Sequence, residues 1–145
     1  MNLLLDTCVL SEFASKQPNE GLINWLEQQL EERLYISTIT IGELKCGTER
    51  LPASQRRERL EQWLTSDVFE RFSGRMLVID TLVMLQWGAL RAQLERAGRP
   101  MPAVDALIAA TVLAHNMQLV TRNVQDFASA GVQLINPWQE SNSSS

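Results

Sequence analysis

Short apolar runs alternate with longer amphipathic stretches along the chain, which is the pattern of parallel strands covered by helices. Each run is bounded by polar or turn residues and has the length of a short strand. The predicted strands are residues 2–5 (NLLL), 34–37 (LYIS), 76–79 (MLVI), 118–121 (QLVT) and 132–135 (VQLI). We therefore expect a three-layer α/β/α domain with a mostly parallel sheet of four to five strands.

Helical spacing of apolar residues fills the intervals between these strands. Three groups show it: Leu22, Ile23, Leu26 and Leu30, then Leu60, Trp63 and Leu64, then Leu82, Leu85 and Leu90. A fourth stretch, residues 104–114 (VDALIAATVLA), is apolar almost all round. We expect it to be the most buried helix, lying directly on the sheet, with Pro102 in its first turn, where a backbone N–H would lack a partner anyway.

Length and composition suit one domain, with residues 1–139 as the folded unit and 140–145 (ESNSSS) as a disordered polar tail. No apolar run reaches the roughly 18 residues of a membrane helix, and the N-terminus lacks the features of a signal peptide. The two cysteines, Cys8 and Cys46, are too few for a disulfide scaffold and lack the spacing of a zinc site. We expect a cytoplasmic protein with reduced thiols.

Acidic and amide side chains occur where ligands bind in parallel α/β sheets, just after the strands. Asp6 directly follows residues 2–5, Glu43 lies in the first turns of the helix after 34–37, and Asp105 opens the buried helix. Asn123 and Asp126 follow residues 118–121. Since parallel strands end at the same edge of a sheet, these side chains are expected to converge there.

Clustered carboxylates raise one another's pKa, so protons or cations must accompany them. Oxygen ligands without His or Cys select Mg²⁺, with Mn²⁺ as a possible substitute, over zinc. The chemistry that uses such a cluster is phosphodiester hydrolysis, in which metal ions activate water and stabilise the leaving oxygen.

Each acid also has a structural alternative. Asp6 and Asp126 could be helix caps, Asp105 could be favoured only by the helix dipole, and Glu43 could be a solvated helix residue. The coincidence of all four at one edge favours the functional interpretation.

Four segments, in order, resemble the motifs of the PIN-domain ribonucleases, in particular VapC-type toxins, including the FitB-like branch. They are LLLDTCVLSE, STITIGELKCG, GRPMPAVDALIAATVLAHN and LVTRNVQDF, and together they span nearly the whole chain. The resemblance implies a PIN-like fold and a Mg²⁺-dependent endoribonuclease that acts as the toxin of a type II toxin–antitoxin pair. It further implies structured RNA, often tRNA, as substrate, a VapB-type antitoxin, and homodimers within a toxin–antitoxin hetero-oligomer.

The resemblance also assigns roles to residues. Asp6, Glu43 and Asp105 correspond to the acids that hold Mg²⁺, and Asn123 or Asp126 fills the fourth position. Thr7 and Thr121 are candidates for hydroxyls that position these ligands or the attacking water. Cys8 stands where relatives often have Asn, and no catalytic role is expected for it.

Two arginine-rich stretches, residues 49–59 and 91–99, have acidic residues interspersed. They can be solvated helix faces, or some of their arginines can bind RNA phosphates. The candidates for RNA contact are Arg56, Arg57, Arg99 and Arg122.

The net charge is −4, with 17 acidic and 13 basic residues, which argues against nucleic-acid binding through bulk positive charge. Setting aside Asp6, Glu43, Asp105 and Asp126 leaves 13 acidic residues against 13 basic. The excess charge therefore belongs to a pocket that a metal ion would neutralise, and RNA is not excluded.

Two rival functions stay open. One is a phosphatase or phosphoryl-accepting receiver that uses Asp6 as nucleophile, although the chain lacks a second Asp two places on. The other is a catalytically weak nucleic-acid-binding or interaction module on a PIN scaffold.

Overall fold

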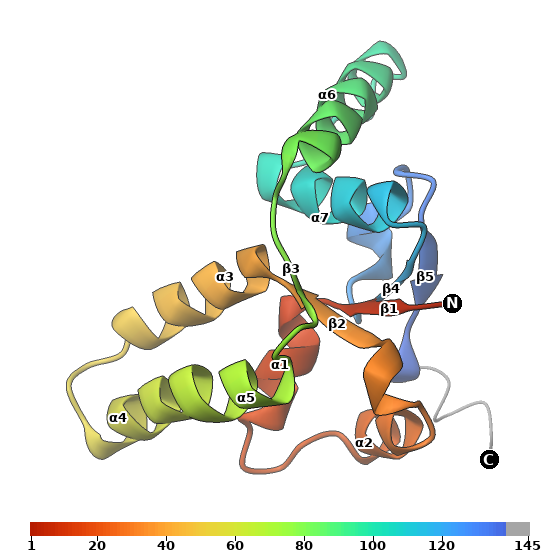
Figure 1. Ribbon diagram of the computed structural model, residues 1–145. Helices are drawn as coiled ribbons and strands as arrows, with labels where there is room; N and C mark the ends of the chain where they lie inside the picture. The colour runs from red at the N-terminus through yellow and green to blue at the C-terminus, as the bar shows by residue number, and fades with distance from the viewer. Residues whose placement is uncertain (139–145) are drawn as a thin grey trace.

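Five parallel strands form the centre of the protein in a computed structural model, which describes residues 1–138 (Figure 1). The strands are β1 (Leu3–Leu5), β2 (Leu34–Ser37), β3 (Met76–Leu77), β4 (Gln118–Val120) and β5 (Gln133–Ile135), paired in the order β3-β2-β1-β4-β5. All five predicted strands are present, each within the predicted range. The predicted tail, residues 140–145, lies outside the described residues.

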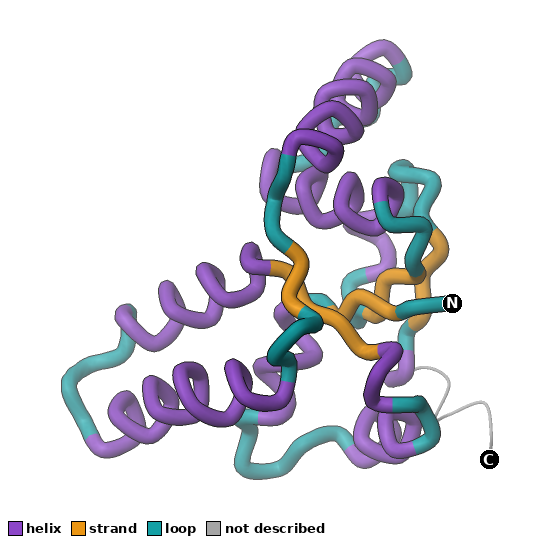
Figure 2. Tube along the Cα trace, viewed as in Figure 1, coloured by secondary structure: helices purple, strands orange, loops and turns teal. Residues whose placement is uncertain are grey.

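Helices connect the strands and cover both faces of the sheet (Figure 2). The α-helices are α1 (Thr7–Phe13), α2 (Glu20–Glu27), α3 (Thr38–Glu49), α4 (Gln55–Gln62), α5 (Phe69–Arg71), α6 (Thr81–Arg96) and α7 (Ala103–Ala114). A π-helix, η2 (Trp63–Val68), joins α4 to α5, and the short 3-10 helices are η1 (Glu31–Arg33) and η3 (Val124–Phe127). The three-layer α/β/α prediction is confirmed.

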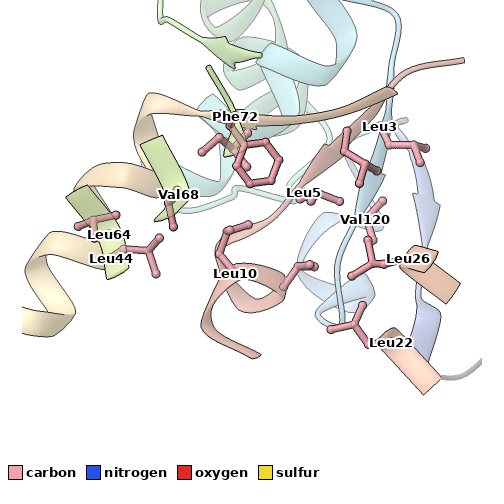
Figure 3. Packing of buried hydrophobic residues seen from close by; sticks show 13 residues of the cluster. Leu3, Leu5, Leu10, Leu22, Leu26, Leu44, Leu64, Val68, Phe72 and Val120 are labelled. Atoms are coloured by element: carbon pink, nitrogen blue, oxygen red, sulfur yellow. The ribbon is translucent and has the colours of Figure 1, made fainter. Parts of the chain in front are cut away.

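The alternation of side chains along the strands divides the core in two, because successive residues of a strand point to opposite faces. Leu3 and Leu5 pack with α1, α2 and the α3–α5 region in one cluster, which Figure 3 shows around Leu10, Phe72 and Val120. Leu4 and Leu119 pack on the other face with α6 and α7. Strands that are apolar on both faces are typical of a buried parallel sheet.

The direction of chain winding reverses between β1 and β4. The chain passes from β1 to β2 and β3 on one side, then returns to form β4 and β5 on the other. In such sheets the carboxyl ends of the two central strands diverge into a crevice that binds ligands. Asp6 follows β1 and Thr121 follows β4, so both lie at this point.

Three sequence expectations about helices need correction. Leu30 does not belong to the helix that carries Leu22 and Leu26, because α2 ends at Glu27, and Leu30 is 59% exposed. Pro102 is the N-cap residue of α7 and lies one position before its first turn. On α6, Leu82 and Leu85 are exposed, at 69% and 67%, while Val83 and Leu90 are buried. The spacing predicts the helix correctly, but two of the three leucines that carry the pattern face outward because α6 packs on α7 through the other side.

The helix α7 is the most buried of the helices, as expected, with six residues in the core. Its first turn is less covered, because Val104 is exposed. Among residues 1–138, no helix is both long and apolar enough to span a bilayer.

Candidate active site

Asp6 lies where the chain turns from β1 into α1. Its Oδ1 accepts a 2.8 Å hydrogen bond from the Thr7 backbone N–H, and its Oδ2 accepts one of 2.9 Å from the Thr121 hydroxyl. Asp6 is only 7% exposed. Burial raises the pKa of its carboxyl, the bonds from Thr121 and Thr7 lower it, and the charges of Glu43 and Asp126 raise it. Asp6 thus caps α1, and its carboxylate is buried close to the negative charges of Glu43 and Asp126.

A pair of hydroxyls ties Glu43 of α3 to the start of α1. Thr7 Oγ1 donates to Glu43 Oε1 at 2.5 Å and lies 3.1 Å from Thr40 Oγ1. Thr40 is buried and lies one helical turn before Glu43, on the same face of α3. Thr40 is absent from the site residues predicted from sequence, although its spacing of three residues from Glu43 is a usable signal.

Asp105 and Asp126 bring two further carboxylates to this edge of the sheet. Asp105 lies in the first turn of α7 and Asp126 lies in η3. Partial burial raises the pKa of Asp105, and the charges of Asp126, Asp6 and Glu43 raise it further. Neither Asp105 nor Asp126 has a side-chain hydrogen bond or ion pair within the described part of the chain.

The four carboxylates grouped by the sequence analysis are therefore within electrostatic reach of one another. Within residues 1–138, no three His, Cys, Asp or Glu side chains are close enough to form a ready-made metal site. The carboxylates repel one another, and a divalent cation is a group that offsets such repulsion. Oxygen-only donors fit Mg²⁺ or Mn²⁺ rather than zinc.

Asn123 and Asp126, the two candidates for the fourth position, differ in their contacts. The backbone N–H of Asn123 donates to Thr121 Oγ1 at 3.0 Å, while its side chain is exposed and makes no hydrogen bond within residues 1–138. Asp126 acts on the carboxyl groups of both Asp6 and Asp105. The structure thus brings the charge of Asp126 to the cluster and engages Asn123 through its backbone.

Cys8 lies beside the cluster. Its Sγ is 3.5 Å from Thr121 Oγ1 and accepts a hydrogen bond from the Arg122 backbone N–H at 3.5 Å. Burial raises the pKa of the Cys8 thiol. Because a neutral thiol is a poor nucleophile, the side chain contributes packing and position at the end of β4.

A groove of about 870 Å³ opens beside the carboxylate cluster, between α1, α3 and α4. Thr7 and Glu43 line it, so it shares two residues with the candidate site. Lys16, Arg56 and Arg59 also line it. Lys16 and Arg59 are absent from the sequence-based site residues, because nothing in their spacing shows that they face one cavity.

Arg57 differs from Arg56, its neighbour in the sequence. Its guanidinium pairs with Glu49 at 2.8 Å and with Glu61 at 3.0 Å, and donates to the Leu51 carbonyl at 3.2 Å. Arg57 thus joins the end of α3 to α4, and its charge is already compensated. Of these two predicted RNA contacts, the structure brings only Arg56 to the groove.

The other two predicted RNA contacts lie elsewhere. Arg99 is exposed in the loop between α6 and α7, where its backbone N–H closes the end of α6 on Leu94. Arg122 lies two residues after the end of β4, with its guanidinium over the Trp138 ring, 5.5 Å from the ring centre. Arg122 is therefore next to the candidate site.

Comparisons with known proteins agree with this fold. Residues 3–132 match the PIN domain model. The chain belongs to the PIN-domain family, and its relatives include VapC and FitB proteins. It is 35% identical to a VapC ribonuclease of Sinorhizobium fredii over 94% of this chain and 98% of the relative, and 34% identical to the toxin FitB of Neisseria gonorrhoeae over 95% and 99%.

The solved structure of FitAB bound to a DNA fragment is also similar. It superimposes with a TM-score of 0.88 and 34% identity, over 94% of this chain and 95% of that chain.

Proposed function

We propose that this protein is a Mg²⁺-dependent endoribonuclease and the toxin of a VapBC-type toxin–antitoxin pair. The observation that carries the proposal is the group of four carboxylates from four segments, gathered at the switch point of the sheet. Two of them, Asp105 and Asp126, have no partner within residues 1–138. Relatives with more than 30% identity are named a ribonuclease and a toxin, which supports the same function.

Asp6 and Asp105 would hold the ion, and Glu43, with Asp126 or Asn123, would complete its surroundings or orient the attacking water. When bound, Mg²⁺ or Mn²⁺ makes water more acidic and stabilises negative charge on the phosphate and the leaving oxygen. Thr121 and Thr7 fix the two oxygens of Asp6, and Thr7 also holds Glu43. The protein's contribution is therefore mainly to position negatively charged oxygens before the ion arrives.

The proposed substrate is structured RNA such as tRNA, as the resemblance to VapC toxins implies. The proposed partner is a VapB-type antitoxin that covers the site. The similarity to FitAB, solved as a complex bound to DNA, supports assembly into a toxin–antitoxin hetero-oligomer.

A homodimer is the proposed state of the toxin itself. Five exposed apolar residues lie in the first turns of α6 and α7 or shortly before α6, and we call this region the α6 face: Val78, Leu82, Met84, Leu85 and Val104. Exposed apolar side chains that gather on a surface mark interaction sites. A second copy, related by two-fold symmetry, would cover the α6 face with its own.

The decisive experiment is RNA cleavage with Mg²⁺, with EDTA, and by the variants Asp6→Asn and Asp105→Asn. We expect each variant to lower the cleavage rate at least about a hundredfold, and EDTA to abolish cleavage. Asp67→Asn is the matched control, because Asp67 is exposed on η2 and lies outside the cluster and the groove. Cleavage that survives EDTA, or variants as active as the parent, would refute the mechanism. A covalent phosphate on Asp6 would instead support the phosphatase alternative.

A further inference from the structure

The groove between α1, α3 and α4 leads away from the carboxylates along a two-helix arm. In Figure 1, α3 and α4 lie side by side and project from the sheet, with α1 near their base. Thr7 and Glu43 line the groove and also belong to the carboxylate network. A polymeric substrate whose cleaved bond lies at the four carboxylates could therefore extend into the groove.

The groove is lined by positive charge that the protein leaves uncompensated. Lys16, Arg56 and Arg59 are exposed side chains at its wall. None of the three has an ion pair within residues 1–138, whereas Arg57 on the same helix as Arg56 and Arg59 has two. In a chain with a net charge of −4, three unpaired cations around one cavity select an anionic ligand.

Apolar side chains line the same groove. Leu44 of α3, Leu60 of α4 and Trp63 of η2 contribute to it, and Trp63 is only partly buried. Aromatic side chains and cations in one groove are typical of sites that bind single-stranded nucleic acid, because bases stack on aromatic rings while Lys and Arg bind the phosphates. The volume is within the roughly 300–1,000 Å³ of ligand pockets.

We infer that this groove binds the single-stranded stretch of RNA next to the bond that is cut, with Lys16, Arg56 and Arg59 on its phosphates. The inference rests on the proposed ribonuclease function. Continuity with the carboxylate cluster favours RNA over an acidic protein segment, because a substrate strand must extend beyond the bond that is hydrolysed. The three cations act on substrate position and affinity and take no part in the chemical step.

The test is fluorescence anisotropy with a labelled single-stranded oligoribonucleotide of about 12 nucleotides, on the Asp6→Asn background with Mg²⁺ present. The triple variant Lys16→Ala, Arg56→Ala, Arg59→Ala should bind at least about tenfold more weakly. Its slope of log affinity against log salt should fall by about 2, since each phosphate contact to a single strand contributes about 0.7. Arg50→Ala is the control, because Arg50 is exposed and unpaired within the described residues and lies outside the groove.

A second variant probes the groove without changing charge. Gly47 of α3 lines the groove, and a Cβ added there meets no atom within 4 Å. Gly47→Leu should therefore fold normally, fill the groove and weaken RNA binding with an unchanged salt slope. Circular dichroism and the melting temperature check that both variants are folded.

The outcomes separate this inference from the proposed function. If the parent cleaves RNA but the triple variant has the same affinity, salt slope and KM, the groove assignment is wrong and the nuclease stands. If RNA affinity depends on the three cations while the parent never cleaves, the groove assignment is right and the nuclease is wrong. The inference is overturned if Arg50→Ala loses as much RNA affinity as the triple variant. It is also overturned if the triple variant binds polyglutamate, a probe for an acidic protein segment, more weakly than the parent does but binds RNA equally well.

Discussion

The Thr121 hydroxyl donates a 2.9 Å hydrogen bond to Asp6 Oδ2, joining residues 115 positions apart in sequence. The two residues follow the paired strands β1 and β4, between which the chain winding reverses. The same hydroxyl accepts from the Asn123 backbone N–H at 3.0 Å. Thr121 therefore holds both a candidate metal ligand and the segment that leads to Asp126.

Replacing Thr121 with Val removes this hydrogen bond at nearly constant volume. We expect a loss of about 1–3 kcal/mol in the free energy of unfolding, because a buried carboxylate oxygen loses its donor. The bond from Thr121 lowers the pKa of Asp6, so its loss should raise that pKa further and move the acid limb of the cleavage profile to higher pH. Urea denaturation and a pH–rate profile measure both effects. Thr121→Ser, which keeps the hydroxyl, should restore the parent's profile.

Asp105→Asn should make the protein more stable at neutral pH while it lowers activity. The folded-state pKa of Asp105 is raised, first by burial and then by Asp126, Asp6 and Glu43. The folded state therefore holds this proton more tightly than the unfolded state, and stability falls as pH rises from the ordinary Asp value of 3.8 through the raised pKa. Asparagine lacks this penalty, so the difference between variant and parent should shrink towards low pH. A variant less stable than the parent at pH 7 in urea would contradict this prediction.

Mg²⁺ should stabilise the folded parent, because a ligand that binds only the folded state adds about 2.7 kcal/mol at a concentration of 100 Kd. We expect the melting temperature to rise with Mg²⁺ concentration in differential scanning calorimetry. The double variant Asp6→Asn, Asp105→Asn should show no such rise, since it lacks two of the proposed ligands. This measurement tests the metal without relying on an RNA substrate.

The α6 face provides a test of the proposed dimer. Leu82→Glu with Leu85→Glu places charges on two exposed positions and should convert a dimer into a monomer in analytical ultracentrifugation. Monomer stability should change by only about 0.5 kcal/mol per site, as for other surface substitutions. Leu90→Ala on the buried side of α6 is the contrast: it should cost about 2–5 kcal/mol of stability through a core cavity. An unchanged dimer in the charged variant would place the contact elsewhere.

Periodicity alone predicts most of the fold. The five strands are four residues or fewer and apolar on both faces, a pattern that a buried parallel sheet imposes on its sequence. The same periodicity misassigns Leu82 and Leu85, because spacing defines a face of a helix but not which neighbour covers it. The acids that follow the strands are equally visible in the sequence, since a parallel sheet gathers the carboxyl ends of its strands at one edge.

Tertiary structure decided which polar groups meet. The pairing of Thr121 with Asp6 and of Thr7 with Glu43 depends on the order of strands and the docking of α1 on α3. The sequence treats Arg56 and Arg57 alike, but packing of α4 against α3 pairs Arg57 with Glu49 and leaves Arg56 facing the groove. The sequence by itself determined the class of fold and the presence of acidic residues after the strands, because both depend on the pattern of neighbouring residues along the chain. Only the folded chain decided which charges are neutralised and which remain free, because that depends on contacts between distant segments.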